Sequence, residues 1–249
     1  MPLKAHGFQI FVKPVGARCN LHCSYCYYIK NLDLFPEERS FVMSGQVLEK
    51  YIVQNIEASD KDIINFSWHG GEPLLAGISF FRQAVELQRK HLNSGRTIIN
   101  GIQTNGTLID PEWCRFFADH GFIVGISIDG PGDLHDRNRI SNSGTQTSEK
   151  VLRGYELLHD HKIPAEILCV INAYNVKHPL VIYNFFKQLR ALHITFLPLV
   201  NRVPGSETNV SPDSVPSLEF GIFLSTIFDE WVEKDIGKIN YPAPILHKL

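Results

Sequence analysis

The segment Cys19-Asn-Leu-His-Cys23-Ser-Tyr-Cys26 places three cysteines close together, with three and then two residues between them. It follows an apolar run, residues 8–15, that is predicted to be a β-strand. Cysteine thiolates are the usual protein ligands of iron–sulfur clusters. Three thiolates from one short loop can bind three irons of a [4Fe–4S] cube and leave the fourth iron open for a small molecule. The segment therefore predicts a metal centre at the end of the first strand.

Two other interpretations of these cysteines are possible. Zinc is the main one, because His22 or His69 could complete a site with three cysteines. Structural zinc sites usually take ligands from two separated pairs, however, and the sequence shows no second pair. The other is three unrelated core cysteines, which would rarely have this spacing in a polar loop flanked by aromatic residues. The remaining cysteines, Cys114 and Cys169, lie in predicted apolar elements and are interpreted as buried core residues.

The composition is that of an ordinary globular protein. The chain has 249 residues, 44% hydrophobic and 20% charged, with a formal net charge of −2. Its odd number of cysteines, five, argues against a disulfide scaffold. No apolar run approaches the roughly 18 residues that a membrane helix needs. We therefore expect a soluble, cytoplasmic protein that has neither nucleic acid nor a membrane as its main partner.

Short apolar runs alternate with longer amphipathic ones along the whole chain. The runs predicted to be strands are residues 8–15, 63–68, 97–103, 123–128, 165–172 and 194–200. Those predicted to be helices are residues 44–58, 79–92, 111–120, 147–161, 176–192 and 217–234. Six β–α units in series predict an α/β fold with a parallel sheet, either open and doubly wound or a partial barrel. In both architectures the functional groups lie at the carboxyl ends of the strands.

Several of these strand ends carry polar or glycine-rich segments. Gly70 and Gly71, followed by Glu72, could let a ligand approach the backbone closely. Asn105-Gly106 after the third strand is by itself only a turn signal. After the fourth strand, Ser127 could bind a ribose hydroxyl, and Arg139 could bind a carboxylate.

The cysteine spacing, with Tyr25 before the last cysteine, resembles the signature of the radical S-adenosylmethionine (SAM) superfamily. The resemblance implies a partial (β/α)6 barrel of the TIM-like type, with a [4Fe–4S] cluster on Cys19, Cys23 and Cys26. It also implies that one-electron reduction of the cluster cleaves SAM and gives a radical that abstracts a hydrogen atom. The cofactor-binding residues that it implies are Tyr25, Gly70, Gly71, Glu72, Ser127, Arg139 and Val200.

The longer segments 19–28, 68–77, 102–110 and 125–131 resemble the anaerobic sulfatase-maturating enzymes, and the likeness runs from about residue 11 to residue 234. Those enzymes oxidise a cysteine or serine of a sulfatase to Cα-formylglycine. The resemblance implies a sulfatase polypeptide as substrate and a reduced flavodoxin- or ferredoxin-like electron donor. Tyr28 and His69 are the expected substrate contacts.

The sequence departs from this family towards its end. Members continue into a cysteine-rich extension with two auxiliary clusters and the catalytic aspartate, and residues 241–249 no longer resemble them. We expect a SAM core domain over residues 1–240 and a divergent tail over 241–249. We therefore expect cluster and SAM binding but impaired formylglycine formation, with the catalytic base unidentified. The alternatives are modification of another peptide, or an inactive binding fragment.

Overall fold

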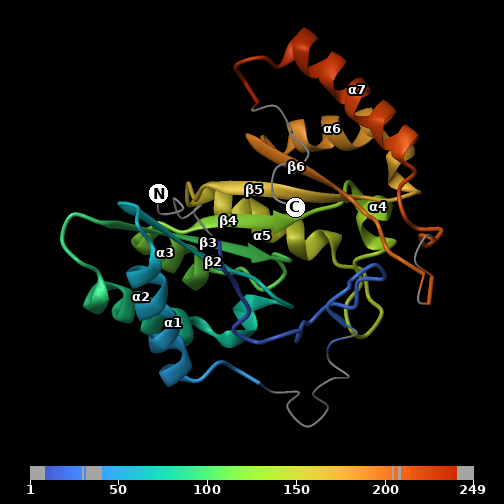
Figure 1. Ribbon diagram of the computed structural model, residues 1–249. Coiled ribbons are helices and arrows are strands. Elements are labelled where there is room, and N and C mark those ends of the chain that lie inside the picture. The colour runs from blue at the N-terminus through green and yellow to red at the C-terminus, as the bar shows by residue number, and fades with distance from the viewer. Residues whose placement is uncertain (1–8, 30, 32–40, 204, 207–208, 240–249) are drawn as a thin grey trace, which may run out of the picture.

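A curved parallel sheet forms the centre of the molecule (Figure 1). The computed structural model describes residues 9–29, 31, 41–203, 205–206 and 209–239. The six strands lie side by side in the order of the chain, and each pair of neighbours is parallel. They are β1 (Phe11–Val12), β2 (Ile63–Trp68), β3 (Thr97–Thr104), β4 (Ile123–Ser127), β5 (Ala165–Ile171) and β6 (His193–Pro198).

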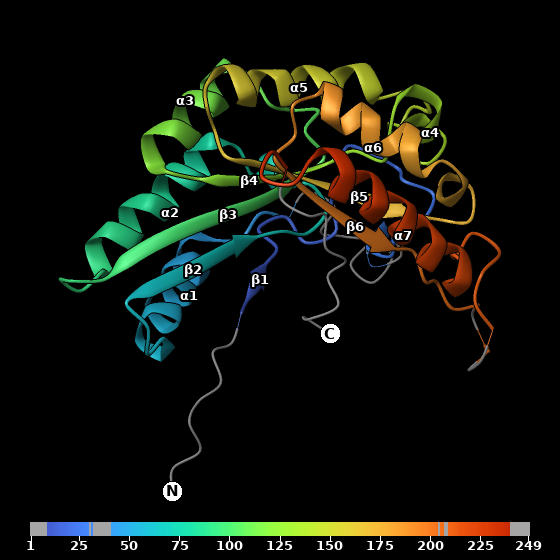
Figure 2. The same ribbon diagram turned by 90° about the horizontal axis from the view of Figure 1, so that it is seen from above.

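Helices follow the strands and lie on the convex side of the sheet, as Figure 2 shows, while α7 packs against α6. The α-helices are α1 (Gly45–Ala58), α2 (Ile78–His91), α3 (Pro111–His120), α4 (Gly132–Asp136), α5 (Ser148–Asp160), α6 (Pro179–Gln188) and α7 (Ser217–Lys234). Two 3-10 helices, η3 (Pro73–Ala76) and η4 (Asn175–Lys177), complete the described elements. The predicted partial (β/α)6 barrel is confirmed.

Local sequence signals account for the helix ends. Ser44 caps α1, because its side chain accepts a hydrogen bond from the Val47 amide. Asp110 caps α3 in the same way through the Trp113 amide, and Pro111 occupies the first position of the helix. Gly121 ends α3 in the left-handed conformation, at φ 62°.

Two predicted elements differ from the structure, and one short helix was not predicted. The first strand was predicted over residues 8–15, but β1 spans only Phe11–Val12 in the described part, because the chain turns at Lys13–Gly16. The helix predicted over residues 176–192 is divided at His178, and α6 begins at Pro179. The short helix α4 was not predicted; it fills the interval between β4 and α5 and buries Leu134 and His135.

The hydrophobic core lies between the sheet and its helices. Phe66 and Trp68 of β2 are fully buried and stack on each other. Trp68 contacts Phe81 of α2, which in turn contacts Trp113 of α3. The indole N–H of Trp68 donates to Asn100 Oδ1 at 2.9 Å, which satisfies its polar atom within the core. This packing holds the strands rigidly, so their carboxyl ends form a fixed platform for the site.

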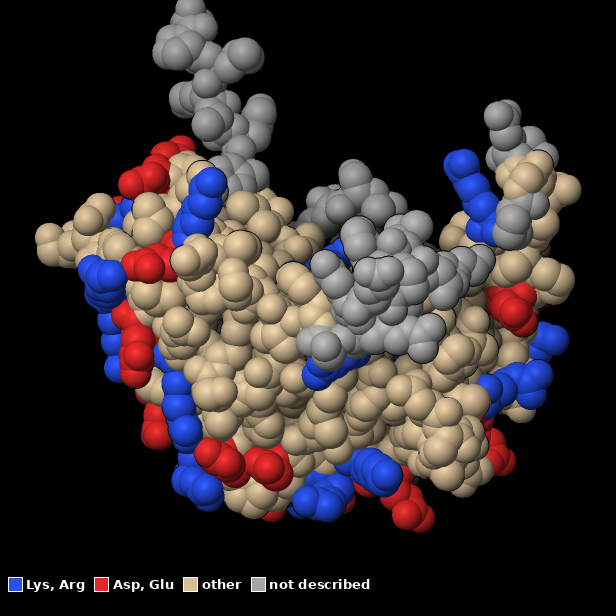
Figure 3. Space-filling model, turned by 90° about the horizontal axis from the view of Figure 1, so that it is seen from below, with Lys and Arg blue, Asp and Glu red and all other residues tan. Residues whose placement is uncertain are grey.

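Charged side chains of both signs lie on the face of the molecule drawn in Figure 3, where they are intermixed. None of the described helices is both long enough and apolar enough to cross a membrane. The divergent tail expected over residues 241–249 lies outside the described residues.

Candidate functional site

The cysteine loop, residues 19–26, lies over the carboxyl ends of the strands and is fastened to the segment that follows α4. The His22 amide donates to the Ile140 carbonyl at 2.8 Å, and the Ser24 amide donates to the Asn138 carbonyl at 2.9 Å. The Ser24 hydroxyl adds a hydrogen bond to the Asn138 side chain at 2.7 Å. The loop is therefore held by residues more than a hundred positions away along the chain.

Beneath this loop is a cavity of about 450 Å³. All the site residues predicted from the sequence line it except Glu72, which is buried behind them. The predicted residues on its wall are Cys19, Cys23, Tyr25, Cys26, Tyr28, His69, Gly70, Gly71, Ser127, Arg139 and Val200. Residues that are distant in the sequence and lie at or beyond the ends of several strands thus meet at one place, as expected for the carboxyl edge of a parallel sheet.

The two glycines after β2 are required by the close approach of the chain that precedes the cysteine loop. A Cβ atom on Gly71 would lie 2.0 Å from the Arg18 carbonyl oxygen. Gly70 has φ 117°, and a Cβ atom on it would lie 2.7 Å from the Gly16 carbonyl oxygen. The Gly71 amide donates to the Gly16 carbonyl at 2.9 Å. The glycines therefore seat this segment of backbone itself, in addition to lining the cavity.

Glu72 is fully buried, and its carboxylate accepts three hydrogen bonds. The donors are the Leu74 amide at 3.0 Å, the Thr104 hydroxyl at 2.8 Å and the Asn105 amide at 2.7 Å. Burial raises the pKa of Glu72 to about 7, while these donors act in the opposite direction. The side chain thereby joins the ends of β2 and β3 directly below the cysteine loop.

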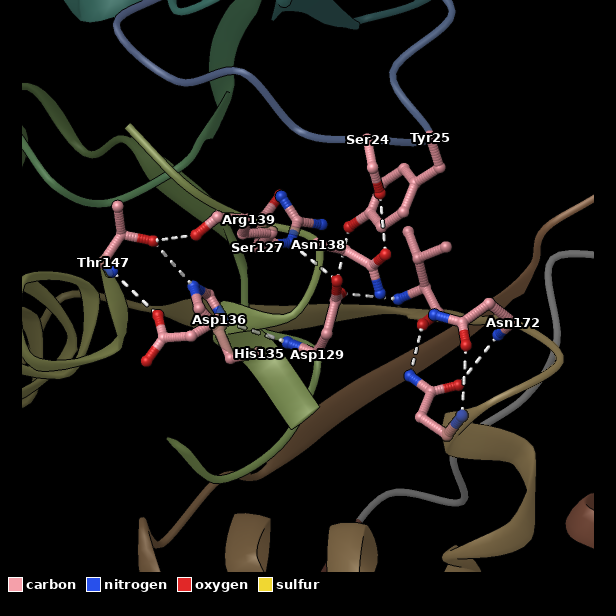
Figure 4. Close-up of polar contacts among 12 residues, drawn as sticks. Ser24, Tyr25, Ser127, Asp129, His135, Asp136, Asn138, Arg139, Thr147 and Asn172 are labelled. Atoms are coloured by element: carbon pink, nitrogen blue, oxygen red, sulfur yellow. Dashed lines mark hydrogen bonds and ion pairs between the residues drawn. The ribbon is translucent and has the colours of Figure 1, made fainter. Parts of the chain in front are cut away.

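Arg139 is held in the cavity wall by a buried carboxylate. Its Nε donates to Asp129 Oδ2 at 2.9 Å, and both side chains are almost completely shielded from solvent. The Tyr25 hydroxyl donates to the same oxygen, and the Val170 amide donates to Asp129 Oδ1 at 3.0 Å. Figure 4 shows Asp129 at the centre of these contacts. Because Asp129 takes only Nε of Arg139, the two Nη groups can bind an anionic ligand.

A second set of contacts, also drawn in Figure 4, fixes the segment between Asp129 and Arg139. The Asp129 amide donates to His135 Nδ1 at 3.3 Å, so His135 carries its proton on Nε2, which lies 3.2 Å from the Thr147 hydroxyl. Thr147 in turn donates to the Arg139 carbonyl at 2.6 Å. Burial lowers the pKa of His135 to about 4, which keeps the ring neutral.

The wall near the ends of β5 and β6 is mainly apolar. Val200 lies just beyond β6 and shares this part of the wall with Leu168, Leu197 and Leu199. The Ser127 hydroxyl accepts from Gln103 Nε2 at 3.1 Å on the neighbouring strand.

Tyr28 and His69 form the wall on the side of β1. Lys13 Nζ lies 4.3 Å from the centre of the Tyr28 ring, and the His69 ring contacts Phe11 edge-on at 4.6 Å. Burial, assisted by Lys13, lowers the pKa of His69 to about 4. His69 is therefore a neutral hydrogen-bonding group at neutral pH.

The three cysteines of the loop fit a [4Fe–4S] cube. Burial raises the pKa of Cys19 to about 12 and raises that of Cys23, so both remain thiols until iron displaces their protons. Among the described side chains, no three histidine, cysteine or acidic groups are placed to bind one shared ion. A cube does not need such a point, because each thiolate binds a different iron.

Sequence reasoning did not select Gln103 or Asn105, although both line the cavity. Asn105-Gly106 was interpreted only as a turn, and the turn is real, since Gly106 has φ 76°. The available signal was the position of Asn105 immediately after β3, because other residues at strand ends form the site. Asp129 also proves to hold Arg139.

The comparisons with known proteins agree with this geometry. Residues 14–185 match the model of the radical SAM superfamily. The chain is 43% identical over 247 residues to a serine-type anaerobic sulfatase-maturating enzyme of Bacteroides thetaiotaomicron, covering 94% of this chain and 59% of that protein. It is 35% identical over 225 residues to a cysteine-type enzyme of Clostridium perfringens, covering 90% and 60%.

A solved structure, native anSMEcpe with bound AdoMet and Cp18Cys peptide, superimposes with a TM-score of 0.83 at 32% identity. The match covers 94% of this chain and 62% of that one, so the chain spans about three fifths of the length of these relatives. The superfamily uses a [4Fe–4S] cluster together with SAM. On its cysteine loop, its partial barrel and the match over most of its length, the chain belongs to the radical SAM superfamily.

Proposed function

We propose that this chain is the SAM-cleaving barrel of an anaerobic sulfatase-maturating enzyme, which converts a cysteine or serine of a sulfatase to Cα-formylglycine. The observation that carries the proposal is the meeting of Cys19, Cys23 and Cys26 with the Gly70–Gly71 edge and Arg139 around one cavity. The bound cofactors would supply one-electron cleavage of SAM and removal of a hydrogen atom from an unactivated carbon.

The chain's own residues would hold the cofactors. Cys19, Cys23 and Cys26 would bind three irons and leave the fourth free for the amino and carboxylate groups of SAM. Gly70 and Gly71 would receive the amino group, with the Glu72 carboxylate behind them attracting its positive charge.

The other end of the cavity suits the remaining parts of SAM. The Nη groups of Arg139 would pair with its carboxylate, and the Ser127 hydroxyl would bind the ribose. Val200 and the leucines beside it would pack on the adenine and exclude water. Tyr25 would support Arg139 through their shared contact with Asp129.

Tyr28 and His69 line the cavity on the side of β1. We propose that they contact the sulfatase polypeptide, and that a reduced flavodoxin- or ferredoxin-like protein supplies the electron. The support for this substrate is the likeness to both serine-type and cysteine-type relatives. The chain spans only part of the length of these relatives. The test should therefore measure hydrogen abstraction, which is the step proposed for the barrel itself.

A sulfatase peptide deuterated at Cβ of its target serine or cysteine provides that test. The anaerobically reconstituted protein is reduced and incubated with SAM and this peptide. We expect deuterium to appear in the 5′-deoxyadenosine, whereas the same peptide deuterated at a neighbouring residue should transfer none. Deoxyadenosine that forms without deuterium from any sulfatase peptide would overturn the substrate assignment and favour another peptide as the target.

A further inference from the structure

The sulfur of Cys19 accepts two N–H hydrogen bonds. The Leu21 amide lies 3.4 Å from Cys19 Sγ, and the side-chain amide of Asn105 lies 3.7 Å from it. The Leu21 contact belongs to the cysteine loop itself. The Asn105 contact comes from the end of β3, so the sheet reaches the first cysteine of the loop through one side chain.

The amide of Asn105 has only one orientation that satisfies its surroundings. Its Oδ1 accepts from the Thr107 amide at 3.0 Å and from the Thr107 hydroxyl at 2.7 Å. Its Nδ2 must therefore point the other way, where it donates to Asn20 Oδ1 at 2.8 Å and to Cys19 Sγ.

Asn20 closes this arrangement into a ring of three side chains. Its Oδ1 accepts from Asn105, and its Nδ2 donates to the Thr107 hydroxyl at 2.8 Å. Each donor meets an acceptor around the ring, and Asn105 itself is buried. The amide is thus locked with its N–H towards the sulfur.

The backbone of Asn105 has a separate partner. Its amide donates to Glu72 Oε2 at 2.7 Å, and any residue at this position would keep that hydrogen bond. The side chain acts on Cys19, whereas the main chain acts on the carboxylate proposed to attract SAM. A substitution at residue 105 can therefore separate the two effects.

We propose that Asn105, oriented by Asn20 and Thr107, is a positioning residue that raises the reduction potential of the cluster bound to Cys19. This inference rests on the proposed function. When the cluster accepts one electron from the electron-donor protein, its thiolate ligands share the added negative charge. An N–H donor at the sulfur stabilises that reduced state more than the oxidised one, so the potential rises.

The test is a potentiometric titration of the anaerobically reconstituted protein, followed by electron paramagnetic resonance of the reduced cluster. We expect Asn105→Leu, which keeps the number and branching of the side-chain heavy atoms but removes the donor, to shift the midpoint to a more negative potential. The variant keeps the backbone contact with Glu72, so a shift of the midpoint reports the loss of the side-chain donor. Equal midpoints for parent and variant would overturn the proposal.

Two further comparisons separate hydrogen bonding from loop packing. Thr107→Val should shift the midpoint in the same direction by a smaller amount. Thr107→Ser keeps the hydroxyl and should therefore have the midpoint of the parent. Asn142→Ala is the matched control, because Asn142 donates to the carbonyl of Cys19 at 3.0 Å and not to its sulfur. A shift in Asn142→Ala as large as that in Asn105→Leu would contradict the proposal.

Cluster assembly distinguishes the two possible failures. If Asn105→Leu binds no iron, the two Thr107 variants provide the test instead. Equal midpoints for Thr107→Val and Thr107→Ser would then overturn the role of Asn105. A parent protein that assembles no [4Fe–4S] cluster would contradict the proposed function, and the role of Asn105 with it. A parent with a cluster and an unchanged midpoint in every variant would contradict the Asn105 proposal alone.

Discussion

At the scale of single residues, burial decides the strength of each ion pair in this molecule. Arg139–Asp129 and Arg82–Glu112 have the same 2.9 Å separation. The side chains of the first pair are 8% and 0% exposed, and those of the second are 55% and 51% exposed. Water screens the charges of the exposed pair. If one partner of the buried pair is removed, water cannot solvate the charge that remains.

We therefore expect Asp129→Asn to destabilise the fold by about 3–5 kcal/mol, because it leaves the Arg139 charge buried and unpaired. The Tyr25 hydroxyl and the Val170 amide also lose their ionised acceptor. The measurement is chemical denaturation. Glu112→Gln is the control and should cost at most about 1 kcal/mol. Equal losses in the two variants would show that Asp129 does not carry this charge balance.

His135 predicts a specific acid sensitivity. Its pKa falls from 6.5 to about 4 on folding because the ring is buried. The neutral ring is therefore compatible with the folded state, and its contribution to stability is fully present above pH 6.5. That contribution is lost as the pH falls from 6.5 towards 4 and amounts to about 3 kcal/mol. The free energy of unfolding of the parent should fall over this range by about that much more than that of His135→Gln. Parallel pH profiles would refute this role.

At the scale of elements, the end of β2 and the segment before the cysteine loop form one unit. Gly71→Ala would place a Cβ 2.0 Å from the Arg18 carbonyl, so the backbone must move. We expect the variant to bind much less iron and sulfide after anaerobic reconstitution. Gly221→Ala, in open space on α7, is the control and should be neutral or slightly stabilising. Iron content in Gly71→Ala equal to the parent's would be inconsistent with this packing.

The elements that sequence predicted best are those with signals at both ends. The helix over residues 111–120 begins at Asp110-Pro111 and ends at Gly121, and its predicted bounds agree with α3. The first strand was predicted too long because apolar content alone marked it, and the turn at Lys13–Gly16 depends on contacts with Gly70 and Gly71. Tertiary contacts set such boundaries, and a single sequence does not display them.

The candidate site shows the same division. The cysteine spacing and the glycine pair could be recognised because each is a short pattern of neighbouring residues in the sequence. The role of Asn105 could not be predicted, because it depends on how Thr107 and Asn20 orient its side-chain amide in the fold. The buried partnership of Asp129 with Arg139 likewise joins residues ten positions apart through the fold.

At the scale of the whole molecule, the partial barrel assembles a cavity from segments spread between residues 19 and 201. Each segment comes from a different strand end, so no single β–α unit could bind the cofactors alone. The cysteine loop spans this edge and is fastened to residues 138–142 on the other side. The central claim is that this whole arrangement cleaves SAM.

The most direct test measures 5′-deoxyadenosine and methionine released from SAM by the dithionite-reduced, reconstituted protein. The account predicts equal amounts of the two products from the parent and from Cys114→Ala, whose cysteine lies in the core. Release should be abolished in Cys23→Ala. No deoxyadenosine from a parent protein that contains four irons and four sulfides, or undiminished release from Cys23→Ala, would contradict the account.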